Sequence, residues 1–125
     1  MTIQRKHGCW GEDLASGFLS ANGIELVERN WRYRRAEIDF IGMDKDILVF
    51  IEVKMRASLA FGRPEDMVGP RKRRLIIDAA MAYMRQSGYE REIRFDVVAI
   101  YGQPGVVPEI RHFRDAFFPG LDYPG

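Results

Sequence analysis

The chain has one cysteine, Cys9, among its 125 residues. A single thiol can form neither an internal disulfide nor a thiolate metal cluster, so we expect a protein of a reducing compartment. Long apolar runs are also missing: the longest, Ala79 to Met84, is far shorter than the ~20 residues of a membrane span. No apolar stretch follows the basic residues near the start, as it would in a signal peptide. These absences predict a cytoplasmic protein without a membrane partner.

An excess of charge of one sign is absent as well. The 19 Lys and Arg residues are balanced by 18 Asp and Glu residues, which leaves a net charge of +1. A protein that binds polyanions through basic tails would be far more basic, so any nucleic-acid site must be local. The length and the 46% hydrophobic content fit one compact domain over residues 1–125, with a loop-like tail from about residue 115.

Hydrophobic periodicity predicts a helix, three strands, a second helix and two further strands. The first helix ends near Asn22, and the second runs from Pro70 to a Gly88 cap. Strands are expected at Ile24 to Tyr33, Ala36 to Ile41, Ile47 to Lys54, Ile93 to Tyr101 and Val106 to Phe113, the last an edge strand because it carries Pro108. An irregular stretch, Ala57 to Gly69, precedes the second helix. This order favours an α/β sandwich around a mixed sheet.

Two carboxylates on the second and third strands form the most informative pair. A turn centred between Asp44 and Lys45, or between Lys45 and Asp46, puts Asp39 and Glu52 on one face, either opposite or one diagonal step apart. A turn centred on Lys45 alone separates them, and the sequence leaves that register open. Two carboxylates held this close repel unless one is protonated or a cation lies between them.

Lys54 follows Glu52 by two residues and therefore shares its strand face. Leu48 and Phe50 occupy the same face, so the charged pair ends a covered strand, where charges need partners or a function. Hard carboxylate oxygens suit Mg²⁺ or Mn²⁺, and a nearby ammonium offsets charge on a reacting phosphate. This is the chemistry of a metal-dependent phosphodiesterase. The alternative is a solvated strand face on which charge alternates with valine for solubility.

Further charged residues flank this pair. Glu12, in the first helix, is a candidate further metal ligand or an ordinary acid in a first helical turn. Two basic clusters suit a negatively charged polymer, although a solvated helix start explains the second equally well. The clusters are Arg32, Arg34 and Arg35 before the acidic strand, and the run from Arg71 to Arg74 at the start of the second helix, in which Arg71 and Lys72 are the candidate nucleic-acid-binding residues.

The remaining polar residues give weaker signals. Asp96 is expected to be a structural strand residue, hydrogen-bonded at the end of the sheet. His7 and His112 lack metal-ligand spacing, no serine or cysteine has a visible base partner, and glycine-rich phosphate loops are absent.

Several segments in order along the chain resemble the YraN family of bacterial proteins. They are Gly11-Glu12-Asp13-Leu14-Ala15, Arg29-Asn30-Trp31-Arg32, Glu37-Ile38-Asp39, Val49-Phe50-Ile51-Glu52-Val53-Lys54, Phe61-Gly62, Lys72, Ala79-Ala80 and Arg94-Phe95-Asp96-Val97-Val98. The resemblance implies one restriction-endonuclease-like domain, a three-layer sandwich with a central mixed sheet flanked by helices. That fold is similar to Holliday-junction resolvases and other nucleases of the PD-(D/E)xK type.

The resemblance also implies roles for individual residues. Asp39 and Glu52 would be catalytic metal ligands, Lys54 the catalytic lysine, Glu12 the helix-borne acid and Lys72 an accessory residue near the substrate. The implied function is a Mg²⁺-dependent nuclease that binds nucleic acid, DNA more than RNA, and a homodimer is compatible with it. The alternative is a catalytically inactive nucleic-acid-binding or scaffolding module of the same fold.

Overall fold

The computed structural model describes residues 3–56, 67–102 and 105–117, with side chains from Trp10 onward. The helices are α1 (Ile3–Ala21) and α2 (Pro70–Ser87). The strands are β1 (Glu25–Tyr33), β2 (Ala36–Asp44), β3 (Ile47–Arg56), β4 (Ile93–Tyr101) and β5 (Glu109–Phe113). This confirms the predicted order of elements. Residues 57–66 of the predicted irregular stretch, and residues 118–125 of the predicted tail, lie outside the described residues.

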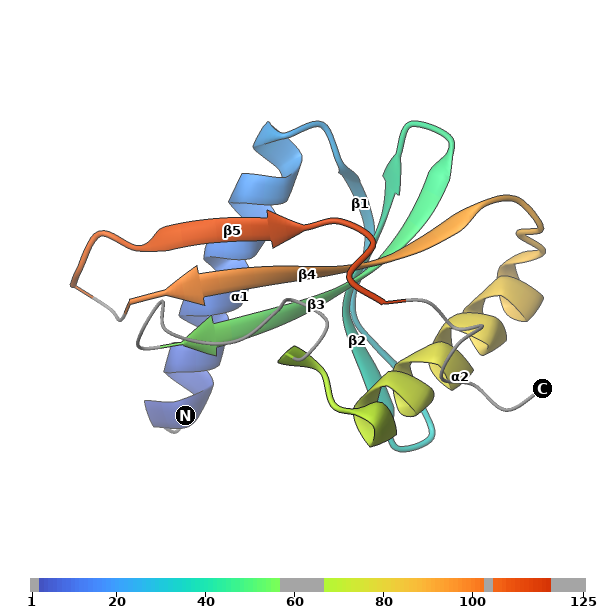
Figure 1. Cartoon of the computed structure of the whole chain (residues 1–125), viewed down its shortest axis with the longest axis horizontal. Helices are drawn as coiled ribbons and strands as arrows, with labels where there is room; N and C mark the ends of the chain where they lie inside the picture. Colours follow the sequence, from blue (N-terminus) through green and yellow to red (C-terminus); the bar gives the residue numbers. More distant parts are fainter. Residues whose placement is uncertain (1–2, 57–66, 103–104, 118–125) are drawn as a thin grey trace.

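The five strands form one mixed sheet in the order β1-β2-β3-β4-β5 (Figure 1). Neighbouring strands are antiparallel except β3 and β4, which are parallel and joined through α2. Pro70 starts α2, where its missing N–H is not needed, and Gly88 ends it with a φ of 74°. The predicted α/β fold with a mixed sheet is therefore confirmed.

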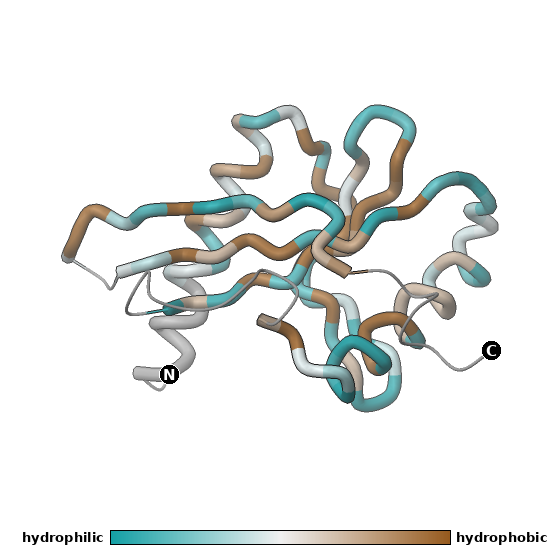
Figure 2. Tube along the Cα trace, viewed as in Figure 1, coloured by the Kyte–Doolittle hydropathy of each residue, from teal (hydrophilic) through white to brown (hydrophobic). Residues whose placement is uncertain are grey.

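The two helices cover opposite faces of the sheet and create two hydrophobic clusters (Figure 1). Ala15 and Leu19 of α1 pack on Val49 and Val98, and α2 packs on the other face. The α2 cluster centres on Phe50, Phe95, Ile76, Ile77 and Ala80. Figure 2 shows hydrophobic residues along the central strands and hydrophilic ones at the β1–β2 and β2–β3 turns. In the described part of the chain, neither helix is apolar enough over its length to cross a bilayer.

The C-terminal strand is shorter than predicted. It starts at Glu109 and not at Val106. Pro108 has no N–H to donate to β4, and the two valines before it face solvent, with Val107 93% exposed. Beyond β5, the beginning of the predicted loop-like tail packs on the sheet: the Phe117 ring stacks on Phe95 with a centroid distance of 5.1 Å. The Ala116 N–H also donates to the Phe95 carbonyl oxygen at 2.8 Å.

A buried carboxylate, Asp96, ties β4 to β5. Its oxygens accept hydrogen bonds from Arg94 Nε at 2.8 Å and from the Asp115 N–H at 3.0 Å, and His112 Nε2 lies 2.7 Å away. Burial alone would raise the pKa of Asp96, but the hydrogen bonds from His112, Arg94 and the Asp115 amide hold it below its ordinary value. Arg94 also bonds Asp44 at the end of β2. The hydrogen bonds predicted for Asp96 as a strand residue are therefore present.

Replacing Asp96 with alanine should lower the free energy of unfolding by about 3–5 kcal/mol, because Arg94 would remain buried without its main partner. Urea unfolding measures the loss. Glu109→Ala, which removes an exposed carboxylate from β5, is the control and should change stability by less than about 0.5 kcal/mol. Equal effects of the two substitutions would contradict this role for Asp96.

Candidate functional site

The candidate site begins with the register between β2 and β3. Asp44 pairs with Ile47, so the turn is centred between Lys45 and Asp46, which is one of the two predicted turns that keep Asp39 and Glu52 together. The last pair of this ladder is Phe40 with Ile51, and the next position in the same register sets Asp39 directly across from Glu52.

The strands separate at this point. The pairing of β2 with β3 ends at Phe40 and Ile51, whereas β3 stays paired with β4 as far as Arg56. Past that last pair, the Val53 N–H donates 2.7 Å to Asp39 Oδ2 in place of a backbone carbonyl. A side chain thus replaces the partner strand, and the gap leaves room for functional groups between the two strands.

The β1–β2 hairpin changes faces beside this gap. Ile38 packs in the α2 cluster and Phe40 in the α1 cluster, although strict alternation would put both on one face. The paired strand β1 changes faces at the same place. Trp31 packs on the α2 side, whereas the Arg29 guanidinium lies over the Phe40 ring, 5.6 Å from its centroid. Asn30, between them, has a φ of 53°, in the left-handed region that asparagine tolerates better than most residues.

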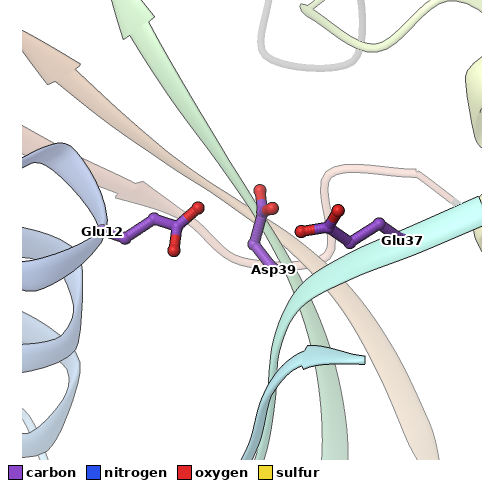
Figure 3. A group of neighbouring side chains, drawn as sticks. All are labelled: Glu12, Glu37 and Asp39. Carbon is purple, nitrogen blue, oxygen red and sulfur yellow. The ribbon is translucent and has the colours of Figure 1, made fainter. Parts of the chain in front are cut away.

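This change of face gathers three carboxylates on the α1 side. Glu37 and Asp39 of β2 lie beside Glu12 of α1, and one oxygen of each lies within 4.8 Å of the others (Figure 3). Asn30 Nδ2 holds two of them by donating to Glu37 Oε1 at 2.9 Å and to Glu12 Oε2 at 3.3 Å. Arg29 adds an ion pair to Glu12. This cluster of acidic residues could bind a metal ion, since carboxylate oxygens are the ligands that hard cations prefer.

The carboxylate of Glu52 is balanced differently. It is 4% exposed, and its Oε2 lies 3.2 Å from Lys54 Nζ and 3.0 Å from Lys72 Nζ. Burial alone would lower the pKa of Lys72, but the negative Glu52 outweighs it and holds that pKa above its ordinary value. The two lysines thus compensate the charge of a carboxylate that is almost completely buried.

Asp39 lies between these two groups of charges. Burial raises the pKa of Asp39 to about 8, and the neighbouring Glu52 carboxylate adds to the rise by repulsion and by hydrogen bonding. The bond from the Val53 amide opposes this rise, and Glu12 adds a smaller repulsion. The Asp39 carboxyl therefore keeps its proton near neutral pH when no cation is present.

Most of the predicted site residues surround one cavity of about 240 Å³. Its lining is Glu12, Asp39, Glu52, Val53, Lys54, Met55 and Lys72. A Cβ at Gly11 of α1 would lie 2.5 Å from Met55 Sδ, so a larger residue there would have to displace this flexible side chain at the cavity wall.

The predicted nucleic-acid-binding residues divide into separate groups. Lys72 lies in the cavity, and Arg32 pairs with Glu37 at 3.1 Å at its margin. Arg71 is exposed in the first turn of α2. Arg34 and Arg35, at the β1–β2 turn, line a different pocket against α2.

Sequence reasoning missed Glu37 and Asn30 as members of the site. Glu37 could have been found because it precedes Asp39 by two residues and alternation puts both on one face. Asn30 could have been found from the two-residue turn at Arg34 and Arg35, which sets it across from Asp39. The change of face that directs the Asn30 side chain at Glu12 has no comparable signal.

Comparison with known proteins agrees with the resemblance seen in the sequence. A family model described as uncharacterised protein family UPF0102, the YraN family, matches residues 11–100. The UPF0102 protein of Rhodococcus jostii is 47% identical over 88% of this chain and 94% of its own length. That of Flavobacterium psychrophilum is 42% identical over 89% and 92%, and that of Chlorobium phaeobacteroides is 45% identical over 88% and 91%. The matched range contains every residue of the candidate site, and the chain belongs to the UPF0102 family.

Proposed function

We propose that this chain is a metal-dependent nuclease that hydrolyses phosphodiester bonds in nucleic acid. The observation that carries the proposal is the gap between β2 and β3, in which Asp39 and Glu52 meet with Lys54 and Lys72 beside them. A group of carboxyl side chains next to ammonium groups matches the needs of phosphoryl chemistry.

The residues in the gap fit Mg²⁺ or Mn²⁺. Asp39, Glu52 and Glu12 would hold the ion through oxygen alone, and Glu37 offers a fourth carboxylate within reach of Asp39. Asp39 retains its proton because no nearby cation compensates its ionised form, and a bound metal ion would supply that positive charge. When bound, such an ion polarises a phosphate oxygen and acidifies water.

The protein groups divide the remaining work. Lys54, 19% exposed and paired with Glu52, offers its ammonium to the negative charge that develops on the reacting phosphate. Lys72 is 49% exposed, so the same ion-pair network presents a cation to an incoming phosphate group. Asn30 orients Glu12 and Glu37 without entering the reaction.

Binding of the polymer falls to the local cations. Arg32, Arg71 and Lys72 lie near the cavity or at the start of α2, in a chain whose net charge is only +1. We extend the proposal to DNA in preference to RNA. For a four-way junction the proposal includes a homodimer, because two symmetric cuts need two copies of the site.

A second function is favoured by one observation. Glu52 is already neutralised by two lysines, so the network also suits a nucleic-acid-binding or scaffolding module of the same fold without turnover. Such a module would bind nucleic acid in a salt-dependent way and leave it intact.

Cleavage of labelled DNA and RNA, including a four-way junction, with Mg²⁺ or Mn²⁺ tests the proposed nuclease. Glu52→Gln and Lys54→Ala should each lower the cleavage rate by about a hundredfold or more, because each removes a group that acts on the reacting phosphate. The exposed pair Glu109 and Arg111, replaced singly by alanine, supplies matched controls that should cleave at the wild-type rate. Binding in Ca²⁺ without cleavage in Mg²⁺ or Mn²⁺ would instead support the inactive module.

The pH dependence of stability tests the charge state of Asp39. Its carboxyl holds a proton to about pH 8 in the folded protein but loses it near its ordinary value of 3.8 when unfolded. Between these values the folded state binds more protons, so this group makes the free energy of unfolding fall as pH rises, by up to about 1.4 kcal/mol per pH unit. Melting curves of wild type and Asp39→Asn in EDTA should converge at low pH and separate toward pH 8, the variant being the more stable there. Parallel profiles would contradict the raised pKa.

Asn30→Gly tests how the acidic cluster is oriented. Glycine keeps the φ of 53° without strain but removes both bonds to Glu12 and Glu37. We expect the affinity for Mn²⁺, measured by calorimetry, to fall by about tenfold or more while the melting temperature changes little. Wild-type affinity in the variant would mean that the two carboxylates need no such support.

A further inference from the structure

A second pocket, of about 570 Å³, lies between the β1–β2 turn and α2. Figure 1 shows this turn beside the helix. The pocket is lined by Tyr33, Arg34, Arg35 and Ala36 from the hairpin and by Leu75, Asp78, Met81 and Arg85 from α2. None of these residues belongs to the cavity around Asp39 and Glu52.

The lining combines positive charge with apolar surface. Three exposed arginines, Arg34, Arg35 and Arg85, line the pocket together with one carboxylate, that of Asp78. The Arg34 guanidinium lies over the Tyr33 ring, 5.1 Å from its centroid, so two planar groups stacked on each other line the pocket. A ligand that matches both halves carries an anionic group and a flat, weakly polar group.

The pocket adjoins the candidate nuclease site through two elements. Ala36 of the pocket directly precedes Glu37 of the acidic cluster along β2. On α2, Leu75 follows Lys72 by three residues, a rise of about 4.5 Å along the helix axis. A strand whose phosphate lies at Lys72 can therefore continue along α2 into the pocket.

We propose that this pocket binds one unpaired nucleotide of the substrate strand, its phosphate on Arg34, Arg35 and Arg85 and its base against Tyr33 and Met81. Bases stack on guanidinium and aromatic planes, and grooves for single strands combine such planes with positive charge. A duplex keeps its bases stacked inside and would present only phosphates, leaving the apolar half of the pocket without contacts. The substrate class is therefore nucleic acid with a single-stranded segment. This inference rests on the proposed function in taking nucleic acid as the ligand.

Fluorescence anisotropy in EDTA separates binding from cleavage. The probes are a labelled single-stranded oligonucleotide, the same strand annealed to its complement, and a strand of equal length made of abasic residues. Wild-type protein should bind the single strand about tenfold more tightly than either of the other two, which is the effect of one stacked base.

Substitutions locate that preference. Arg34→Ala and Arg85→Ala should each weaken binding of the single strand by about fivefold to tenfold and reduce its advantage over the abasic strand. Arg111→Ala is the matched control, because Arg111 also lies over a tyrosine ring, that of Tyr101 at 5.6 Å, but on the edge strand β5. It should leave the preference unchanged.

Three results would overturn the inference. They are equal affinity for all three probes, equal loss in Arg34→Ala and Arg111→Ala, and displacement of the oligonucleotide by poly-glutamate as effectively as by unlabelled single strand, which would indicate an acidic peptide. The cleavage assay tests the proposed nuclease independently. A preference for the single strand without cleavage would support the nucleotide pocket and contradict the nuclease. Cleavage without that preference would support the nuclease and contradict the pocket.

Discussion

The hydrogen bond from the Val53 amide to the Asp39 carboxyl group is the constraint on which the candidate site depends. It occupies the place where the next rung of the β2–β3 ladder would lie, so the strands can separate without leaving a part-buried N–H unpaired. Because the bond fixes Asp39 against β3, it also brings this carboxyl beside Glu52. The site is thus the consequence of a sheet that stops pairing one residue before the two carboxylates would face each other.

Charge balance explains how so many acidic groups persist in one place. Asp39 keeps its proton, Glu52 is compensated by Lys54 and Lys72, and Glu12 is paired with Arg29. The compensating cations Lys54, Lys72 and Arg29 belong to β3, α2 and β1. The two helices and the β1–β2 hairpin therefore all have to pack together for the cluster to form. A divalent cation would replace the proton and relieve the same repulsion, which links the folded arrangement to the proposed chemistry.

The sequence predicted those parts of the site that depend on local geometry. Alternation put Glu52 and Lys54 on one face, and two of the three turns that the sequence left open put Asp39 on that face as well. The structure has one of these two turns. The Lys72–Glu52 ion pair could not be derived this way, because it depends on how far α2 lies from the sheet. The change of face at Asn30 also escaped, since a left-handed asparagine within a strand leaves no mark in the hydrophobic pattern. The start of β5 was misplaced because Val106 and Val107 look like buried strand residues but face solvent.

A crystal structure with Mn²⁺, located by its anomalous scattering, tests the central claim most directly. We expect one peak bound by both Asp39 and Glu52, with the Asp39 carboxyl ionised and the lysines beside Glu52 released or moved. A peak held by Glu12 and Glu37 without Asp39 and Glu52, or no peak at millimolar Mn²⁺, would contradict it. Either of those results would leave the gap between β2 and β3 as a feature of the fold and not as a metal-dependent active site.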